Sequence, residues 1–142
     1  MIFFAPGLPI GQPRVRASKR GSHAAVYTPS TADAWKAAVA AAAVEAGMVP
    51  TVEDVRCRIV FAQPRPKAHL RTGKRAGELR DDLPPWPRRY DLDNMAKAVL
   101  DALKGIAWAD DCQVQRLSLS RRWAAPGETP GAVIEVERMV AP

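Results

Sequence analysis

Residues 91–103 read Asp-Leu-Asp-Asn-Met-Ala-Lys-Ala-Val-Leu-Asp-Ala-Leu. The apolar residues of this stretch recur at the i, i+3, i+4 and i+7 spacing of a helix that buries one face. Gly105 follows as a stop signal, because glycine adopts the left-handed turn that ends helices. The sequence therefore predicts a helix from Asp91 to near Lys104. Its buried stripe is Leu92, Met95, Ala96, Val99, Leu100 and Leu103, and its solvent stripe is Asp93, Lys97, Asp101 and Lys104.

Shorter patterns on both sides of this helix predict a small sheet. Residues 2–5 form an apolar opening strand, and residues 55–61 alternate between apolar side chains and arginines. Residues 113–123 and 132–140 predict two further strands, which we expect to pair as an antiparallel hairpin. A second helix begins at Ser30 or Thr31 with a capping box and ends at Gly47. The expected fold class is α/β (α+β), with a mixed sheet of about four strands and two main helices.

Two segments between these elements are basic. Residues 10–28 carry Arg14, Arg16, Lys19 and Arg20 before a strand-like piece, which predicts a basic loop or loose hairpin. Residues 62–90 hold five prolines and neither valine nor isoleucine. Such a segment buries little apolar surface, so we expect a mobile basic loop that folds against a ligand.

Composition limits the class of protein. A chain of 142 residues fits one domain, 1–142, and no apolar run is long enough for a membrane span. The opening residues lack the charged flank of a signal peptide, so we expect a cytoplasmic protein. Cys57 and Cys112 are isolated, which predicts buried free thiols and no zinc site or disulfide framework. The net charge of +6 favours a polyanionic partner.

Carboxylates gather at the start of the central helix, where Asp91 and Asp93 precede Lys97, and the pair Asp110-Asp111 follows that helix. Hydrolysis of a phosphodiester requires an activated water and positive charge on the phosphate, both of which carboxylate-held magnesium supplies. Two helical residues at i and i+2 point about 200° apart, so convergence on one ion requires Asp91 to lie at the cap in extended geometry. Asp101 lies about 12 Å along the helix axis from Asp93, too far to bind the same ion, so it is not a candidate metal ligand.

Purely structural roles are also possible for the same residues. Aspartate at a helix N-cap and in the first turn is common, because it satisfies free amides and the helix dipole. Asp93 and Lys97 could equally form a surface ion pair, and Asp110-Asp111 a turn. The joint pattern in a basic chain favours metal-dependent chemistry on a nucleic acid.

The run 91–103 and the stretch Trp108-Ala-Asp-Asp-Cys-Gln-Val114 resemble the RusA family of Holliday-junction resolvases, in its phage and prophage branch. The resemblance implies that Asp91, Asp93 and Asp111 are catalytic and bind Mg²⁺, with Mn²⁺ as a substitute, and that Lys97 is an essential basic residue. It favours Asp111 over Asp110. It also implies a homodimer that resolves four-way DNA junctions by paired symmetric nicks in recombination and repair, with no membrane partner and no small-molecule cofactor beyond the metal.

One position departs from the family pattern, since Tyr90 intervenes between Arg88-Arg89 and Asp91. The exact phosphate contact at this position therefore does not carry over, although a stacking tyrosine or Arg89 could replace it. The candidates for contacts with the DNA backbone are Arg14, Arg16, Lys19, Arg20, Arg65, Lys67, Lys74, Arg75, Arg88 and Arg89.

Two other functions fit parts of the sequence. The same chemistry could act on forks, flaps or other branched nucleic acid, including RNA. A non-catalytic DNA-binding protein is the third reading, in which the aspartates are only caps. Carboxylates beside a DNA surface argue against it, because they repel phosphate unless a cation intervenes.

Overall fold

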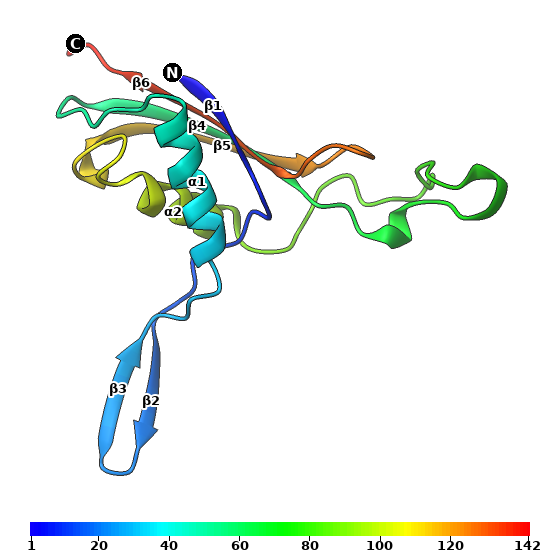
Figure 1. Cartoon of the computed structure of the whole chain (residues 1–142), viewed down its shortest axis with the longest axis horizontal. Helices are drawn as coiled ribbons and strands as arrows, with labels where there is room; N and C mark the ends of the chain where they lie inside the picture. Colours follow the sequence, from blue (N-terminus) through cyan, green and yellow to red (C-terminus); the bar gives the residue numbers. More distant parts are fainter.

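The structure is a computed structural model that describes the backbone of all 142 residues and every side chain except that of Arg20. It is an α+β fold with a mixed four-stranded sheet, two α-helices on one face of the sheet and a separate two-stranded ribbon (Figure 1). The elements are β1 (Ile2–Pro6), β2 (Arg16–Arg20), β3 (His23–Tyr27), α1 (Asp33–Glu45), β4 (Val55–Gln63), α2 (Leu92–Leu103), β5 (Val114–Trp123) and β6 (Gly131–Arg138). Three short 3₁₀ turns, η1 (Lys67–His69), η2 (Gly73–Arg75) and η3 (Asp111–Gln113), complete the chain.

The strand order of the main sheet is β1-β6-β4-β5. The expected hairpin of the last two strands is therefore wrong, because β4 lies between them, parallel to β5 and antiparallel to β6. The physical reason is burial. β4 carries the apolar row Val55, Cys57, Ile59 and Phe61 and occupies the centre, whereas the more polar β5 lies at the edge. Alternation along residues 113–123 predicts that Leu117 faces inward, but Leu117 is 43% exposed on this edge strand.

The core lies between the sheet and the two helices. Met95, Val99 and Leu103 of α2 are fully buried, as the helical spacing predicts. Helix α1 contributes Trp35, Val39 and Ala43. The predicted capping box of α1 is wrong, because the helix begins later, after Ala32, and no side chain caps it.

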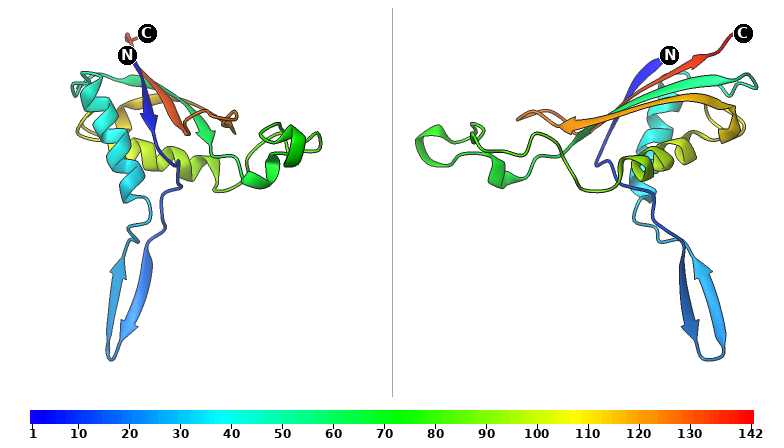
Figure 2. Two further views of the ribbon diagram at one scale, coloured as in Figure 1. Left: turned by 45° about the vertical axis from the view of Figure 1, so that its right-hand side comes forward. Right: turned by 180° about the vertical axis from the view of Figure 1, so that it is seen from behind.

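The basic segments project from this body in different directions (Figure 2). The segment at residues 10–28 forms the hairpin of β2 and β3. The proline-rich loop starts later than expected, because β4 continues to Gln63 and buries Ala62. The loop includes η1 and η2 and a bridge between Leu70 and Leu79, while its mobility remains a prediction.

The two cysteines are free but not alike. Cys57 is buried, and burial raises the pKa of its thiol to about 12. Cys112 is exposed, which corrects the expectation that both thiols are buried. Cys112 lies in η3 on the surface turn between α2 and β5, where no other element covers it.

Candidate functional site

The turn into α2 has the geometry that a shared carboxylate site requires. Asp91 is the N-cap residue in extended conformation, with φ −75° and ψ 139°, as the spacing argument predicts. Tyr90 immediately before it has φ 69°, in the left-handed region that a tyrosine adopts only with strain. Tyr90 therefore makes the turn that takes the chain from the proline-rich loop into the helix. This turn is the structural role of the residue that departs from the family pattern.

Contacts from three other segments hold this turn. Arg121 of β5 donates a hydrogen bond from Nη1 to the carbonyl oxygen of Tyr90 at 2.5 Å. Gln63, at the buried end of β4, donates from Nε2 to the carbonyl oxygen of Arg89 at 3.1 Å. A Cβ on Gly11 would lie 3.3 Å from the Cβ of Tyr90, so the residue there must be small. The start of α2 is therefore held by the ends of β4 and β5 and by the loop after β1.

These supporting residues were not among the sequence-based candidates. A signal existed for Arg121, because alternation along β5 places it on the same side as Leu119, facing the helices. Gln63 gave no signal, because it lies beyond the end predicted for its strand. Gly11 gave none either, because its close neighbour Tyr90 is remote in sequence.

The carboxylates at this turn are free. Asp91, although it is the N-cap, makes no side-chain capping hydrogen bond. Asp91, Asp93 and Lys97 are all exposed, and none of their side chains forms an ion pair with another described residue. The surface pair between Asp93 and Lys97 is thus not formed. Asp101, left out on helix geometry, is instead bound to Lys36 of α1 at 2.7 Å.

A cleft of about 690 Å³ opens beside Asp91. Its basic wall consists of Arg14, Arg16 and Arg89, and Asn94 lies on the helix side. The guanidinium of Arg89 lies 5.1 Å from the centre of the Tyr90 ring. A phosphodiester chain entering this cleft would meet three arginines and reach the Asp91 carboxylate.

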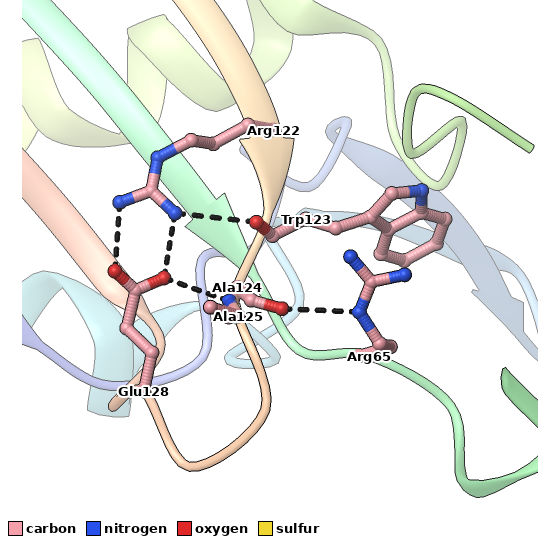
Figure 3. A network of polar contacts seen from close by, with 6 residues as sticks. All are labelled: Arg65, Arg122, Trp123, Ala124, Ala125 and Glu128. Atoms are coloured by element: carbon pink, nitrogen blue, oxygen red, sulfur yellow. Dashed lines mark hydrogen bonds and ion pairs between the residues drawn. The ribbon is translucent and has the colours of Figure 1, made fainter. Parts of the chain in front are cut away.

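The remaining basic candidates are spread over other surfaces. Arg65 donates to the carbonyl oxygen of Ala124 at 3.2 Å and lies over the Trp123 ring, so it holds the base of the loop (Figure 3). Arg75 is paired with Glu78 at 2.7 Å. Lys67, Lys74 and Arg88 are exposed on the loop, and Lys19 is exposed on the hairpin. The predicted contact of Arg20 lies outside the described side chains.

The network in Figure 3 also fixes the β5–β6 connection. Arg122 forms two hydrogen bonds with the carboxylate of Glu128, at 2.6 and 2.9 Å. The Arg122 guanidinium, with a further bond from the backbone of Ala125, lowers the pKa of Glu128 to about 2. These hydrogen bonds hold the two ends of the β5–β6 connection together where it passes the end of β4.

Asp111 lies at the other end of α2. Its Oδ1 accepts a hydrogen bond from Nε1 of the buried Trp108 at 2.8 Å. Asp110 beside it caps η3 by accepting from the amide of Cys112 at 3.0 Å, which lowers the pKa of Asp110. Asp110 thus has a structural role, while Asp111 keeps a second oxygen toward solvent.

The twelve residues of α2 put Leu103 about 18 Å from Asp91 along the helix axis. The ion pair of Lys104 with Asp110, at 3.5 Å, keeps the Asp110-Asp111 pair near that far end. Accordingly, no group of three or more His, Cys, Asp or Glu side chains in the described part of the chain is arranged to hold a metal ion. The start of α2 carries two of these carboxylates, Asp91 and Asp93, two residues apart. The metal site therefore stays a prediction, and one copy of the chain does not assemble the three-carboxylate set.

Comparison with known families decides the assignment. The family described as Endodeoxyribonuclease RusA matches residues 6–137. The chain belongs to the RusA family. No curated protein matches it. The matched range includes both helices, β4, β5, β6 up to residue 137 and every predicted site residue, and it takes in only Pro6 of β1.

RusA membership supports nuclease activity on DNA. The α+β fold agrees with the class expected from the sequence. Among the described helices, none has the length and apolar character needed to cross a membrane.

Proposed function

We propose that this RusA-family chain is a magnesium-dependent endonuclease that resolves four-way DNA junctions by paired nicks, acting as a homodimer in recombination and repair. Manganese is expected to replace magnesium, because both ions favour carboxylate and water oxygens. When bound, the metal supplies positive charge at the scissile phosphate. The chain itself supplies the carboxylates, the basic cleft that orients the DNA backbone and Lys97 one helical turn from Asp93.

One observation carries this proposal: Asp91 makes no capping hydrogen bond, is exposed, and lines the same cleft as three arginines. An aspartate that served the helix would accept from the first-turn amides. Next to a DNA surface, an unpaired carboxylate also repels phosphate. A cation between the two removes this repulsion, which favours metal-dependent chemistry over simple binding.

We further propose that the third carboxylate, Asp111, comes from the second copy. A two-fold axis that sets the two α2 helices antiparallel brings the end of one helix to the start of the other. Asp111 of each copy then meets Asp91 and Asp93 of its partner, and two equivalent sites form together. Such a dimer presents two sites to two opposing strands of a junction.

Cleavage assays with the full chain test this proposal. Labelled four-way junction, fork, flap, duplex and single strand are incubated with Mg²⁺, Mn²⁺ or EDTA. The comparison is between the wild type, Asp93→Asn and the matched control Asp33→Asn, an exposed aspartate in the first turn of α1. We expect paired nicks in the junction only, present in Asp33→Asn and absent from Asp93→Asn and with EDTA.

The other functions give distinct outcomes. Metal-dependent nicks of similar rate in forks or flaps would favour the broader branched-substrate nuclease. Binding of the junction without cleavage in either metal would overturn the enzymatic proposal and leave a DNA-binding protein.

A further inference from the structure

The β2–β3 hairpin projects from the body as a free ribbon (Figures 1 and 2). Its two strands pair with one another, and of their described side chains all but Ser18 are exposed. Isolated two-stranded hairpins are only marginally stable in water. A ribbon that is held by no other layer of the protein is suited to a partner that it meets outside the body.

The charge of the ribbon identifies the class of partner. Residues 11–32 include two lysine or arginine pairs, Arg14 with Arg16 and Lys19 with Arg20, and no acidic residue. Arg14 and Arg16, at the root of the hairpin, line the same cleft as Asp91. The ribbon thus extends the basic wall of the cleft, and two like-charged ribbons from two copies would repel each other.

The dimensions of the ribbon fit one groove of duplex DNA. Paired strands lie about 4.8 Å apart, and each five-residue strand is roughly 16 Å long. The major groove is about 12 Å wide and admits a two-stranded ribbon in undistorted DNA, whereas the minor groove is about 6 Å wide and admits one only where the DNA is deformed. Small side chains keep the ribbon thin, namely Ala17, Ser18, Ala24 and Ala25.

The two faces of the ribbon differ in chemistry. One face pairs Arg16 with Tyr27 and carries His23 nearer the tip, so it can donate hydrogen bonds. The other face pairs Ala17 with Val26, which is 71% exposed, and carries Lys19 opposite Ala24. Hydrogen-bonding and small apolar side chains are the two kinds that recognise base edges and thymine methyl groups in the major groove.

We propose that the β2–β3 hairpin enters the major groove of a duplex arm beside the junction centre. This inference rests on the proposed function, because the cleft at its root orients the same DNA strand. The hairpin would position the arm, while the cleft and the α2 carboxylates act on the backbone.

Dimethyl sulfate footprinting of a labelled four-way junction tests the inference, because the reagent methylates guanine N7 in the major groove and adenine N3 in the minor groove. All variants are made in the Asp93→Asn background, which prevents cutting during the assay. Ala24→Trp adds bulk to the exposed ribbon, and Ala37→Trp adds the same bulk to the exposed face of α1. Lys19→Ala and Arg138→Ala form a second matched pair of exposed cations.

We expect the unmodified ribbon to protect guanine N7 in one stretch of each arm, and Ala24→Trp to abolish this protection while Ala37→Trp keeps it. Lys19→Ala removes one phosphate contact, so the slope of the logarithm of the binding constant against the logarithm of the salt concentration should become shallower by about 0.9. This change is equivalent to a roughly eight-fold loss of affinity at about 0.1 M salt. Arg138→Ala should change neither quantity.

Unchanged N7 protection and affinity in Ala24→Trp, or protection of adenine N3 alone, would overturn the inference. The cleavage assay keeps this failure separate from that of the proposed function. If the wild type cuts the junction but the hairpin protects no guanine N7, only the groove contact is overturned. Hairpin-dependent N7 protection without cutting in either metal overturns only the nuclease, and a chain that binds no DNA overturns both.

Discussion

Replacing Arg121 with methionine tests how the start of α2 is held. Methionine keeps the apolar stem of the half-buried arginine and removes its charged donor. The main bond lost is that from Nη1 to the carbonyl oxygen of Tyr90, at 2.5 Å, together with longer contacts to the carbonyl oxygen of Arg89 and the sulfur of Met95. A hydrogen bond from a charged donor contributes about 1.5–3 kcal/mol, and the partial exposure of this one suggests about 2 kcal/mol. The free energy of unfolding should fall by that amount.

Urea denaturation measures the effect. With a slope of about 2 kcal/mol per M, the unfolding midpoint should fall by about 1 M. The control is Arg116→Met, an exposed arginine on the same strand, which should change the free energy of unfolding by less than about 0.5 kcal/mol. Junction cleavage by Arg121→Met should fall roughly ten- to a hundred-fold, because small displacements of reacting groups carry costs of that order. Equal midpoints and equal rates in the two variants would refute the role given to Arg121.

Three further predictions concern other parts of the fold. Gly131→Ala should destabilise the protein by about 1–3 kcal/mol in urea melts, because the new Cβ would lie 2.2 Å from the carbonyl oxygen of Ala5; an unchanged midpoint would contradict the β1–β6 packing. Cys112, whose thiol pKa is raised by the Asp110 carboxylate but which is exposed, should react with a thiol reagent at about pH 9, while buried Cys57, with a pKa of about 12, stays protected until unfolding; two fast equivalents would be inconsistent with that burial. Glu128 should titrate by NMR near pH 2, so that its contribution to stability is complete above its ordinary pKa of 4.5 and is lost as the pH falls through about 2; a midpoint near 4.5 would show that its network is not formed.

Local patterns predicted the parts of this fold that depend on local physics. The stripe of Met95, Val99 and Leu103 and the alternation along β4 reflect burial of one face, which periodicity records directly. The extended conformation of Asp91 also followed from geometry, because two carboxylates two residues apart diverge on a helix.

Sequence reasoning failed where the outcome depends on which element packs beside which. The pairing of β5 with β6 was wrong because nearness along the chain does not show that β4, with its apolar row, takes the central place. Likewise, the spacing between Asp91 and Asp111 does not show that the chain stays at the far end of α2 after the helix ends. There, Trp108 is buried and its Nε1 binds Asp111.

Subunit complementation is the most direct test of the proposed site. A mixture of Asp93→Asn and Asp111→Asn chains, each inactive alone, is refolded together and assayed on the four-way junction with Mg²⁺. In the mixed dimer, one site combines both substitutions and the other combines the intact Asp93 of one copy with the intact Asp111 of the other. We predict that the mixture regains cutting and nicks one strand per junction. A mixture as inactive as the separate variants, beside a wild type that cuts, would contradict the shared site.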